Sequence, residues 1–250
     1  MFKPLAAFSV SLAALIVGLT VWTPGSLAQS RSFLTKLQQG EVSTDPLGSS
    51  IPIPWQQIQT VQARAQQQNR PQTVFERTPL LRSPDGRFAV YSRLLIQAKP
   101  QVTDTSVSSV LFLQDLQTQQ LQAIAASTPR EGLSSNGQAG TVVGFGVLVP
   151  IAWSARGDRV LCRDFQGGNA TDFISDYALI WDQQQRRTYT LAPNRINYSN
   201  AILLGWSRQH PERALFKAGL LGETNWPQWT VQLNGSTAPA PQDEPLKPAS

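Results

Sequence analysis

Short apolar runs separated by polar turns fill the chain between residues 73 and 235. The clearest runs span residues 88–91, 110–113, 159–162, 177–181 and 214–216. Their length and their aromatic and β-branched residues are typical of strands, and no run has a convincing helical period. Asp85 and Gly86 form a tight-turn signal immediately before the first run. The pattern predicts an all-β domain over residues 73–235.

A helical period occurs just before this domain. Between residues 55 and 68, apolar residues recur at intervals of three or four, and glutamines occupy the opposite face. The apolar positions are Trp55, Ile58, Val61 and Ala65. They predict a short helix that packs against the β domain through this stripe. A purely structural domain whose helix docks on a partner protein is the alternative.

The first 28 residues have the pattern of a secretory signal. Lys3 precedes an uncharged apolar stretch, and Ser26 and Ala28 have the small side chains that a signal peptidase accepts. Cleavage after Ala28 predicts a periplasmic or secreted protein. An uncleaved membrane anchor is the alternative, because the apolar stretch approaches the length that spans a bilayer.

The composition of the remaining segments predicts how the mature chain is divided. Residues 29–72 are expected to form a loosely attached arm that carries the short helix, because the part before the helix is rich in Ser, Gly, Pro and Gln. Residues 236–250 contain several Pro and Ala and few bulky apolar residues, which predicts a disordered tail.

An internal repeat organises the β domain. A serine, a polar turn, an arginine and an apolar strand occur in that order after Ser83, Ser154 and Ser207. About 30 residues later, the strands of the first two copies end in Asp115 and Asp182. Such serine and aspartate side chains can bond the backbone of the adjacent turn. The Trp before the second and third serines can fill the gap between adjacent sheets.

These repeats resemble those of TolB-type β-propellers. The turn at residues 83–86 has the Ser-Pro-Asp-Gly sequence of that family, and Asp115 and Asp182 match its strand-end aspartate. The second copy departs by an extra residue around Gly157, and the third has His-Pro-Glu in place of Asp-Gly. The resemblance implies a β-propeller-like array of three to four antiparallel sheets. It also implies a role as an interaction partner in the periplasm, and a homodimer is one way to cover open sheet edges.

Charge and composition exclude several classes of function. The chain has 21 Lys and Arg against 16 Asp and Glu, a net charge of +5, and no dense basic block, so nucleic acid is not expected as a partner. One Cys and one His exclude an intrachain disulfide and Cys-rich or His-based metal centres. The glycines at 140, 144 and 146 fit no nucleotide-binding motif and predict a bent strand. We expect no cofactor and no metal.

Few residues are candidates for catalysis. The single histidine, His210, lies in a polar turn with no nucleophile motif nearby and is expected at the surface. Cys162 alternates with neighbouring strand residues in a way that points its thiol inward. The acidic residues gather around Asp164 and Asp176, which are candidate binding residues. In the alternative function, a hydrolase of envelope glycans or peptides, such carboxylates would be the catalytic groups.

The candidate recognition surface is aromatic. Trp226 and Trp229 flank Pro227, and because proline within a sheet belongs at an edge, these indoles are expected to be partly exposed and to bind a partner. Repetition without a catalytic constellation favours a binding protein. The sequence therefore predicts an exported, non-enzymatic binding module that interacts with an envelope protein or a cell-wall polymer.

Overall fold

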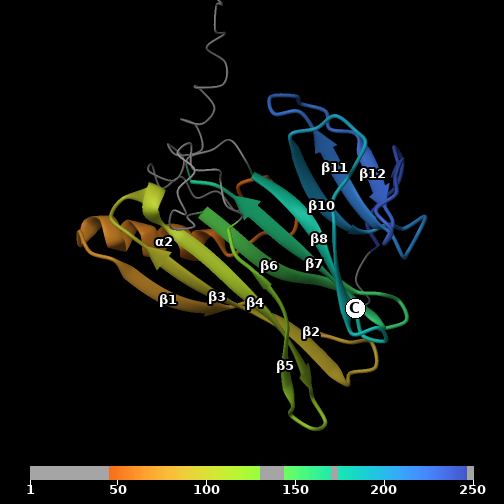
Figure 1. The fold of residues 1–250 in the computed structure, drawn as a ribbon, viewed down its shortest axis with the longest axis horizontal. Helices are drawn as coiled ribbons and strands as arrows, with labels where there is room; N and C mark the ends of the chain where they lie inside the picture. The colour runs from red at the N-terminus through yellow and green to blue at the C-terminus, as the bar shows by residue number, and fades with distance from the viewer. Residues whose placement is uncertain (1–44, 130–143, 170–173, 247–250) are drawn as a thin grey trace, which may run out of the picture.

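The computed structural model describes residues 45–129, 144–169 and 174–246, and Figure 1 shows their arrangement. In chain order the elements are α2 (Trp55–Gln67), β1 (Gln72–Arg77), β2 (Leu81–Arg82), β3 (Phe88–Ala98), the 3-10 helix η1 (Val102–Asp104), β4 (Ser106–Asp115), β5 (Leu121–Ser127), β6 (Gly144–Trp153), β7 (Arg159–Gly167), β8 (Ile174–Asp182), β9 (Arg187–Leu191), β10 (Asn200–Trp206), β11 (Ala214–Gly219), β12 (Gln228–Val231) and β13 (Thr237–Pro239). The predicted all-β domain with one short helix before it is confirmed for the described residues. The predicted signal, residues 1–28, lies outside them.

The strands form two sheets in the described part of the chain. One has nine strands in the order β1-β3-β4-β6-β7-β8-β9, with β2 on β3 and β5 on β4, and the other has the order β10-β11-β12-β13. The sequence predicted three to four separate sheets, and the described strands form two. The reason is a short parallel pairing of β4 with β6, at Ser106–Gly144 and Val107–Phe145, which joins what would be the first two sheets. Both strand orders are open-ended among the described strands.

Within these sheets, the three repeat copies form three antiparallel meanders. The first consists of β3, β4 and β5, with β1 and β2 paired to β3. The second is β6 to β9 and the third is β10 to β13, with every neighbouring pair antiparallel. The only parallel contact between the described strands is the β4–β6 junction.

A serine hydroxyl fixes the turn before β3 and the equivalent turn before β7. The N–H of Phe88 donates to Ser83 Oγ at 2.9 Å, and the N–H of Arg159 donates to Ser154 Oγ at 3.0 Å, in each case five residues after the serine. Gly86 and Gly157 occupy the same place in the two turns, with φ of +70° and +69°. The extra residue expected around Gly157 does not lengthen the turn: it lies between Gly157 and Arg159, whereas Arg87 directly follows Gly86.

Strand-end aspartates hold the following turns, as predicted. Asp115 Oδ1 accepts bonds from the N–H groups of Gln117 and Thr118, and Asp182 Oδ1 accepts one from Gln185. Each aspartate also pairs with the arginine of its own repeat, Arg87 at 3.2 Å and Arg159 at 2.9 Å. Each ion pair joins the start of one strand to the end of the next, β3 to β4 and β7 to β8. It therefore helps to fix the register between the two strands.

The third meander is completed by residues expected to be disordered. The N–H of Ser207 donates to the carbonyl of Arg213, which makes this turn one residue longer than the others, and the Ser207 hydroxyl donates to Asp243. Asp243 is buried, and Thr237–Pro239 form the outer strand β13. The expected disorder of residues 236–250 is wrong for this ordered part, because Asp243 accepts the Ser207 hydroxyl, as Asp85 and Asp158 accept the serine hydroxyls of the first two turns. Residues 247–250 lie outside the described residues.

The helix α2 covers one face of the nine-stranded sheet, as predicted. Its four apolar stripe residues are buried, and they pack with Leu94, Ile96 and Phe165 of the sheet. The rings of Trp55 and Phe145 meet edge to face with centroids 5.3 Å apart. The stripe is therefore already covered by the chain's own core and is not free to dock on a partner. In the described part of the chain, no helix has the length and apolar character needed to cross a membrane.

Tryptophans pack between successive meanders, as the repeat predicts. Trp153 lies in a buried cluster with Val90 and Leu111 of the first meander, and its indole N–H donates to the Leu81 carbonyl at 3.2 Å. Trp206 is buried in a cluster that joins the two sheets, and its indole N–H donates to the Ala152 carbonyl at 3.4 Å. Each indole thus contributes apolar area and one hydrogen bond between meanders.

Two glycines of β6 allow backbones to approach closely. A Cβ on Gly144, where φ is +124°, would overlap the carbonyl oxygen of Gly167. A Cβ on Gly146 would lie 2.5 Å from the carbonyl carbon of Thr128. The predicted role of these glycines in shaping the strand is consistent with this crowding. Gly140 lies outside the described residues.

We expect Gly144→Ala to destabilise the fold by crowding and not only by backbone strain. The matched control is Gly48→Ala, because Gly48 also has a positive φ, of +66°, but a methyl group added there would have no atom within 4 Å. Overpacking typically costs about 1–3 kcal/mol, so the free energy of unfolding of Gly144→Ala should fall below that of Gly48→Ala by this amount in urea titrations. Equal losses would contradict the close approach.

Candidate functional site

The two predicted binding carboxylates lie on neighbouring strands but on opposite faces of the sheet. In the antiparallel register of β7 and β8, Phe165 pairs with Asp176 and Asp164 pairs with Tyr177. Paired residues share a face and successive residues alternate, so Asp164 and Asp176 point in opposite directions. Both are buried, at 6% and 0% exposure. The structure therefore does not bring them together into one cleft.

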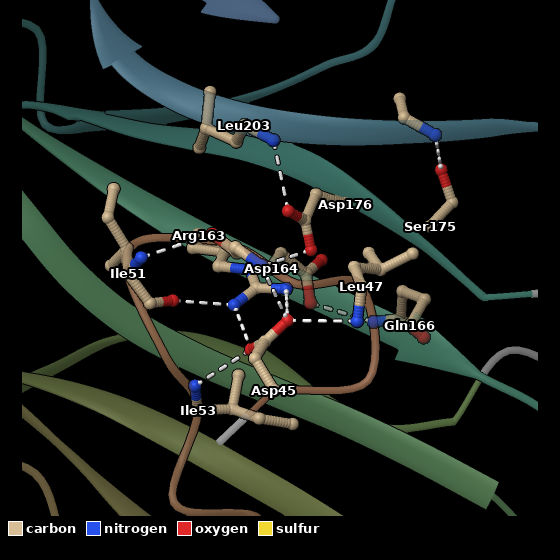
Figure 2. Close-up of polar contacts among 12 residues, drawn as sticks. Asp45, Leu47, Ile51, Ile53, Arg163, Asp164, Gln166, Ser175, Asp176 and Leu203 are labelled. Atoms are coloured by element: carbon tan, nitrogen blue, oxygen red, sulfur yellow. Dashed lines mark hydrogen bonds and ion pairs between the residues drawn. The ribbon is translucent and has the colours of Figure 1, made fainter. Parts of the chain in front are cut away.

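Asp176 belongs to a fully buried ionic network centred on Arg163. Figure 2 shows the Arg163 guanidinium between Asp176 and Asp45. Arg163 Nε donates to Asp176 Oδ1 at 2.7 Å, while Nη1 and Nη2 donate to the two oxygens of Asp45 at 2.5 and 3.2 Å. All three side chains are inaccessible to solvent. A fourth bond from Nη1 to the Ile51 carbonyl, at 2.5 Å, adds to the network.

Asp45 ties the segment before the helix to the sheet. Its Oδ1 accepts bonds from the N–H groups of Leu47 and Ser49, and its Oδ2 accepts one from Ile53. This carboxylate therefore both folds residues 45–53 into a compact loop and pairs with Arg163. The expectation of a loosely attached arm is wrong for this loop, because a buried charge anchors it. Residues 29–44 lie outside the described residues.

Asp176 also joins the two sheets. Its Oδ2 accepts a 2.9 Å bond from the N–H of Leu203 in β10, and the adjacent Ser175 hydroxyl accepts one from Ala201 at 3.0 Å. Burial raises the pKa of Asp176 to about 6, although Arg163 and the Leu203 N–H favour its charged form. Burial alone lowers the pKa of Arg163, but the two carboxylates outweigh it and raise that pKa.

The opposite face holds a smaller polar cluster around Asp164. The Ser127 hydroxyl donates to Asp164 Oδ1 at 2.6 Å, and the Gln166 amide donates to the same oxygen at 2.8 Å and to Ser127 Oγ at 2.6 Å. All three residues are buried. The cluster joins the end of β5 to β7, so its geometry is that of a structural contact between strands.

The two candidate tryptophans are half-buried, but they do not lie at a sheet edge. Trp229 is in β12, which runs between β11 and the outer strand β13, and its side chain packs on the core between the sheets. Trp226 rests on Gly219, where a Cβ would meet the indole at 2.5 Å, and its N–H donates to the Leu220 carbonyl at 3.2 Å. Trp226 thus packs within its own sheet and Trp229 against the core between the sheets, and their binding role stays a prediction.

The other candidate residues lie where the sequence places them. Cys162 is fully buried, and burial raises the pKa of its thiol, with a further contribution from Asp164. His210 is exposed in the turn that follows β10. Among residues 45–129, 144–169 and 174–246, no group of His, Cys, Asp and Glu is arranged to hold a metal ion.

An exposed face of β1 and β3 is the surface that sequence reasoning missed. Phe75 has 75% of its area exposed, and it lines an open depression of about 470 Å³ together with Glu76, Arg77 and Arg93. The sequence did contain a sign of this surface: Phe75 and Arg77 are two positions apart in a short strand, which places both side chains on the same face. Their nearness to Arg93 depends on the pairing of β1 with β3, which the sequence of β1 alone does not reveal.

A comparison of this chain with models of protein families and with curated proteins found no match. Function is therefore argued from the residues themselves.

We expect Arg163→Met to cause a large loss of stability, because it leaves two buried carboxylates without their cation. Removing one partner of a buried ion pair costs about 3–5 kcal/mol. The control is Arg156→Met, whose exposed pair with Asp158 should contribute about 1 kcal/mol or less. Urea unfolding of the two variants measures the difference, and similar losses would contradict a central role for Arg163.

The raised pKa of Asp176 makes stability depend on pH. Because the folded state holds this proton more tightly than the unfolded chain, the stabilisation is complete below about pH 4. It is lost as the pH rises through about 6. We expect the free energy of unfolding of the wild type, minus that of Asp176→Asn, to fall over this range. Asp104→Asn, at an exposed position, is the control. A difference that rises with pH would contradict the assignment.

Proposed function

We propose that this protein is an exported, non-enzymatic binding module that interacts with an envelope protein or a cell-wall polymer. The observation that carries the proposal is the exposed face of β1 and β3, where Phe75 stands beside Arg77 and Arg93. Aromatic residues, Phe among them, and arginine are enriched at protein–protein interfaces relative to the rest of the protein surface. A large exposed ring on a paired strand is costly to solvate and is well placed for recognition.

The rigidity of this surface supports a binding role. β3 pairs along its length with β4, and its other edge pairs with β1 and β2, while α2 packs on the opposite face of the sheet. Side chains on such a scaffold are held in place before a partner arrives, which lowers the entropy cost of association.

The carboxylate geometry argues against the alternative function, a hydrolase of envelope glycans or peptides. A glycosidase needs two carboxyl groups that face one bond from either side, about 5–10 Å apart. Asp164 and Asp176 point to opposite faces of one sheet, and each is bonded to buried neighbours. Neither is presented to a substrate in this arrangement.

A propeller-like array is the architecture that we propose for the repeats. Three antiparallel meanders packed through Trp153 and Trp206 support it, as does the shared serine turn at Ser83 and Ser154. The open outer strands are surfaces where a second copy could pair. The predicted signal in residues 1–28 supports a periplasmic or secreted location.

Binding can be tested with the mature protein, from Gln29 onwards, against purified cell-wall sacculi and against solubilised envelope proteins. We expect co-sedimentation with sacculi or saturable capture of one envelope protein, and a loss of at least roughly tenfold in affinity for Phe75→Ala/Arg93→Gln. Leu221→Ala/Arg208→Gln is the matched control, because it also removes one exposed apolar and one exposed basic side chain elsewhere.

Two results would contradict the proposal. One is binding that the control double variant reduces as strongly as Phe75→Ala/Arg93→Gln does. The other is release of soluble fragments from sacculi by the wild type that Asp164→Asn or Asp176→Asn abolishes while the variants stay folded.

A further inference from the structure

Two arginines face each other across the exposed strands. Arg77 of β1 pairs in register with Arg93 of β3, and both side chains are exposed. Like charges directly opposite each other on adjacent strands destabilise a sheet. Among the described residues, neither guanidinium has an ion pair with a carboxylate or donates a hydrogen bond. The pair therefore costs stability in the isolated chain and offers unused donors.

Aromatic rings hold these cations on the sheet surface. The Arg77 guanidinium lies 5.1 Å from the centroid of Tyr91, and that of Arg93 lies 5.1 Å from Phe112 and 5.9 Å from Tyr91. The two rings stack on each other at 5.7 Å. Such contacts stabilise a cation without neutralising it. The charge therefore remains available to an anion, and guanidinium groups suit carboxylates because their N–H groups form a planar fork.

An exposed apolar side chain lies next to the two arginines, on the same face of the sheet. Phe75 is two residues before Arg77, on the same face of β1, and pairs in register with the half-buried Leu95. A ligand that follows this direction meets an apolar surface and then a double positive charge. An extended polypeptide whose apolar side chain and carboxylate are two residues apart presents both on one face, with the spacing of Phe75 and Arg77.

The edge of the sheet favours a polypeptide over a polysaccharide. β1 is the terminal strand of the nine-stranded order, and Figure 1 shows it along the border of the sheet. One side of its backbone therefore has no strand beside it among the described residues. Free backbone N–H and C=O groups of an edge strand pair with an added strand, a mode of peptide recognition that a polysaccharide cannot use.

We infer that an acidic, extended segment of a partner protein adds to the edge of β1, with a carboxylate on Arg77, an apolar side chain on Phe75, and the charge of Arg93 behind Arg77 adding to the positive potential. This inference rests on the proposed function, since it names the partner of the same surface. It narrows the choice between an envelope protein and a cell-wall polymer to a protein.

The test uses a fluorescent peptide with repeats of Val-Ser-Glu-Ser, titrated against the mature protein and followed by anisotropy, because valine and glutamate two residues apart share one face of an extended strand. We expect saturable binding that weakens with added salt, roughly tenfold weaker binding for Arg77→Gln, and a smaller loss for Arg93→Gln. Arg64→Gln and Arg186→Gln, each made singly, are the charge-matched controls, because both residues are exposed, one on α2 and one in the turn between β8 and β9, and should leave affinity unchanged. Circular dichroism confirms that each variant is folded.

Two further probes separate strand addition from charge attraction. A peptide with the same side chains, methylated at alternate backbone nitrogens, keeps its carboxylates but cannot pair with β1, so we expect it to lose binding. Polygalacturonate supplies carboxylates on a polysaccharide and should bind more weakly than the peptide. Equal binding of polygalacturonate and both peptides would overturn the inference while leaving a binding function intact. Absence of binding by every probe, with capture of a partner still dependent on Phe75, would also overturn it.

Discussion

The buried pairing of Arg163 with Asp45 and Asp176 is the interaction on which the arrangement of the chain depends. One guanidinium satisfies a carboxylate from the loop before the helix and another from β8, and the second carboxylate also accepts a backbone bond from Leu203 in the other sheet. Charges without water are tolerated only when their bonds are complete. The loop, the large sheet and the small sheet must therefore occupy these positions together.

The repeat explains local structure, and the junctions between copies explain the architecture. Ser83 and Ser154 fix equivalent turns, and Asp115 and Asp182 end equivalent strands. The copies differ in how they meet, since the first two share a sheet through β4 and β6 and the third packs as a separate sheet. Similar units thus assemble in two different ways, which no repeat pattern specifies by itself.

Sequence patterns were sufficient where the physical cause is local. The stripe beginning at Trp55 located the helix, because helical periodicity places one face on a core. They failed where the cause is distant. Arg163 in a strand reads as an exposed residue until Asp45, 118 positions earlier, is placed beside it. Asp243 lies in a Pro-rich segment that is ordered through its bond with Ser207. Phe75 is recognised as part of an exposed surface only when the pairing of β1 with β3 is known.

The distance along the chain between the members of the ionic network has a consequence for folding. A guanidinium cannot leave water at low cost until both carboxylates are present, and one of them is separated from it by 118 residues. Closing so long a loop is slow, and its entropy must be lost before the contact stabilises anything. We therefore expect desolvation of Arg163 to be a late event in folding, with this region still hydrated in partly assembled molecules.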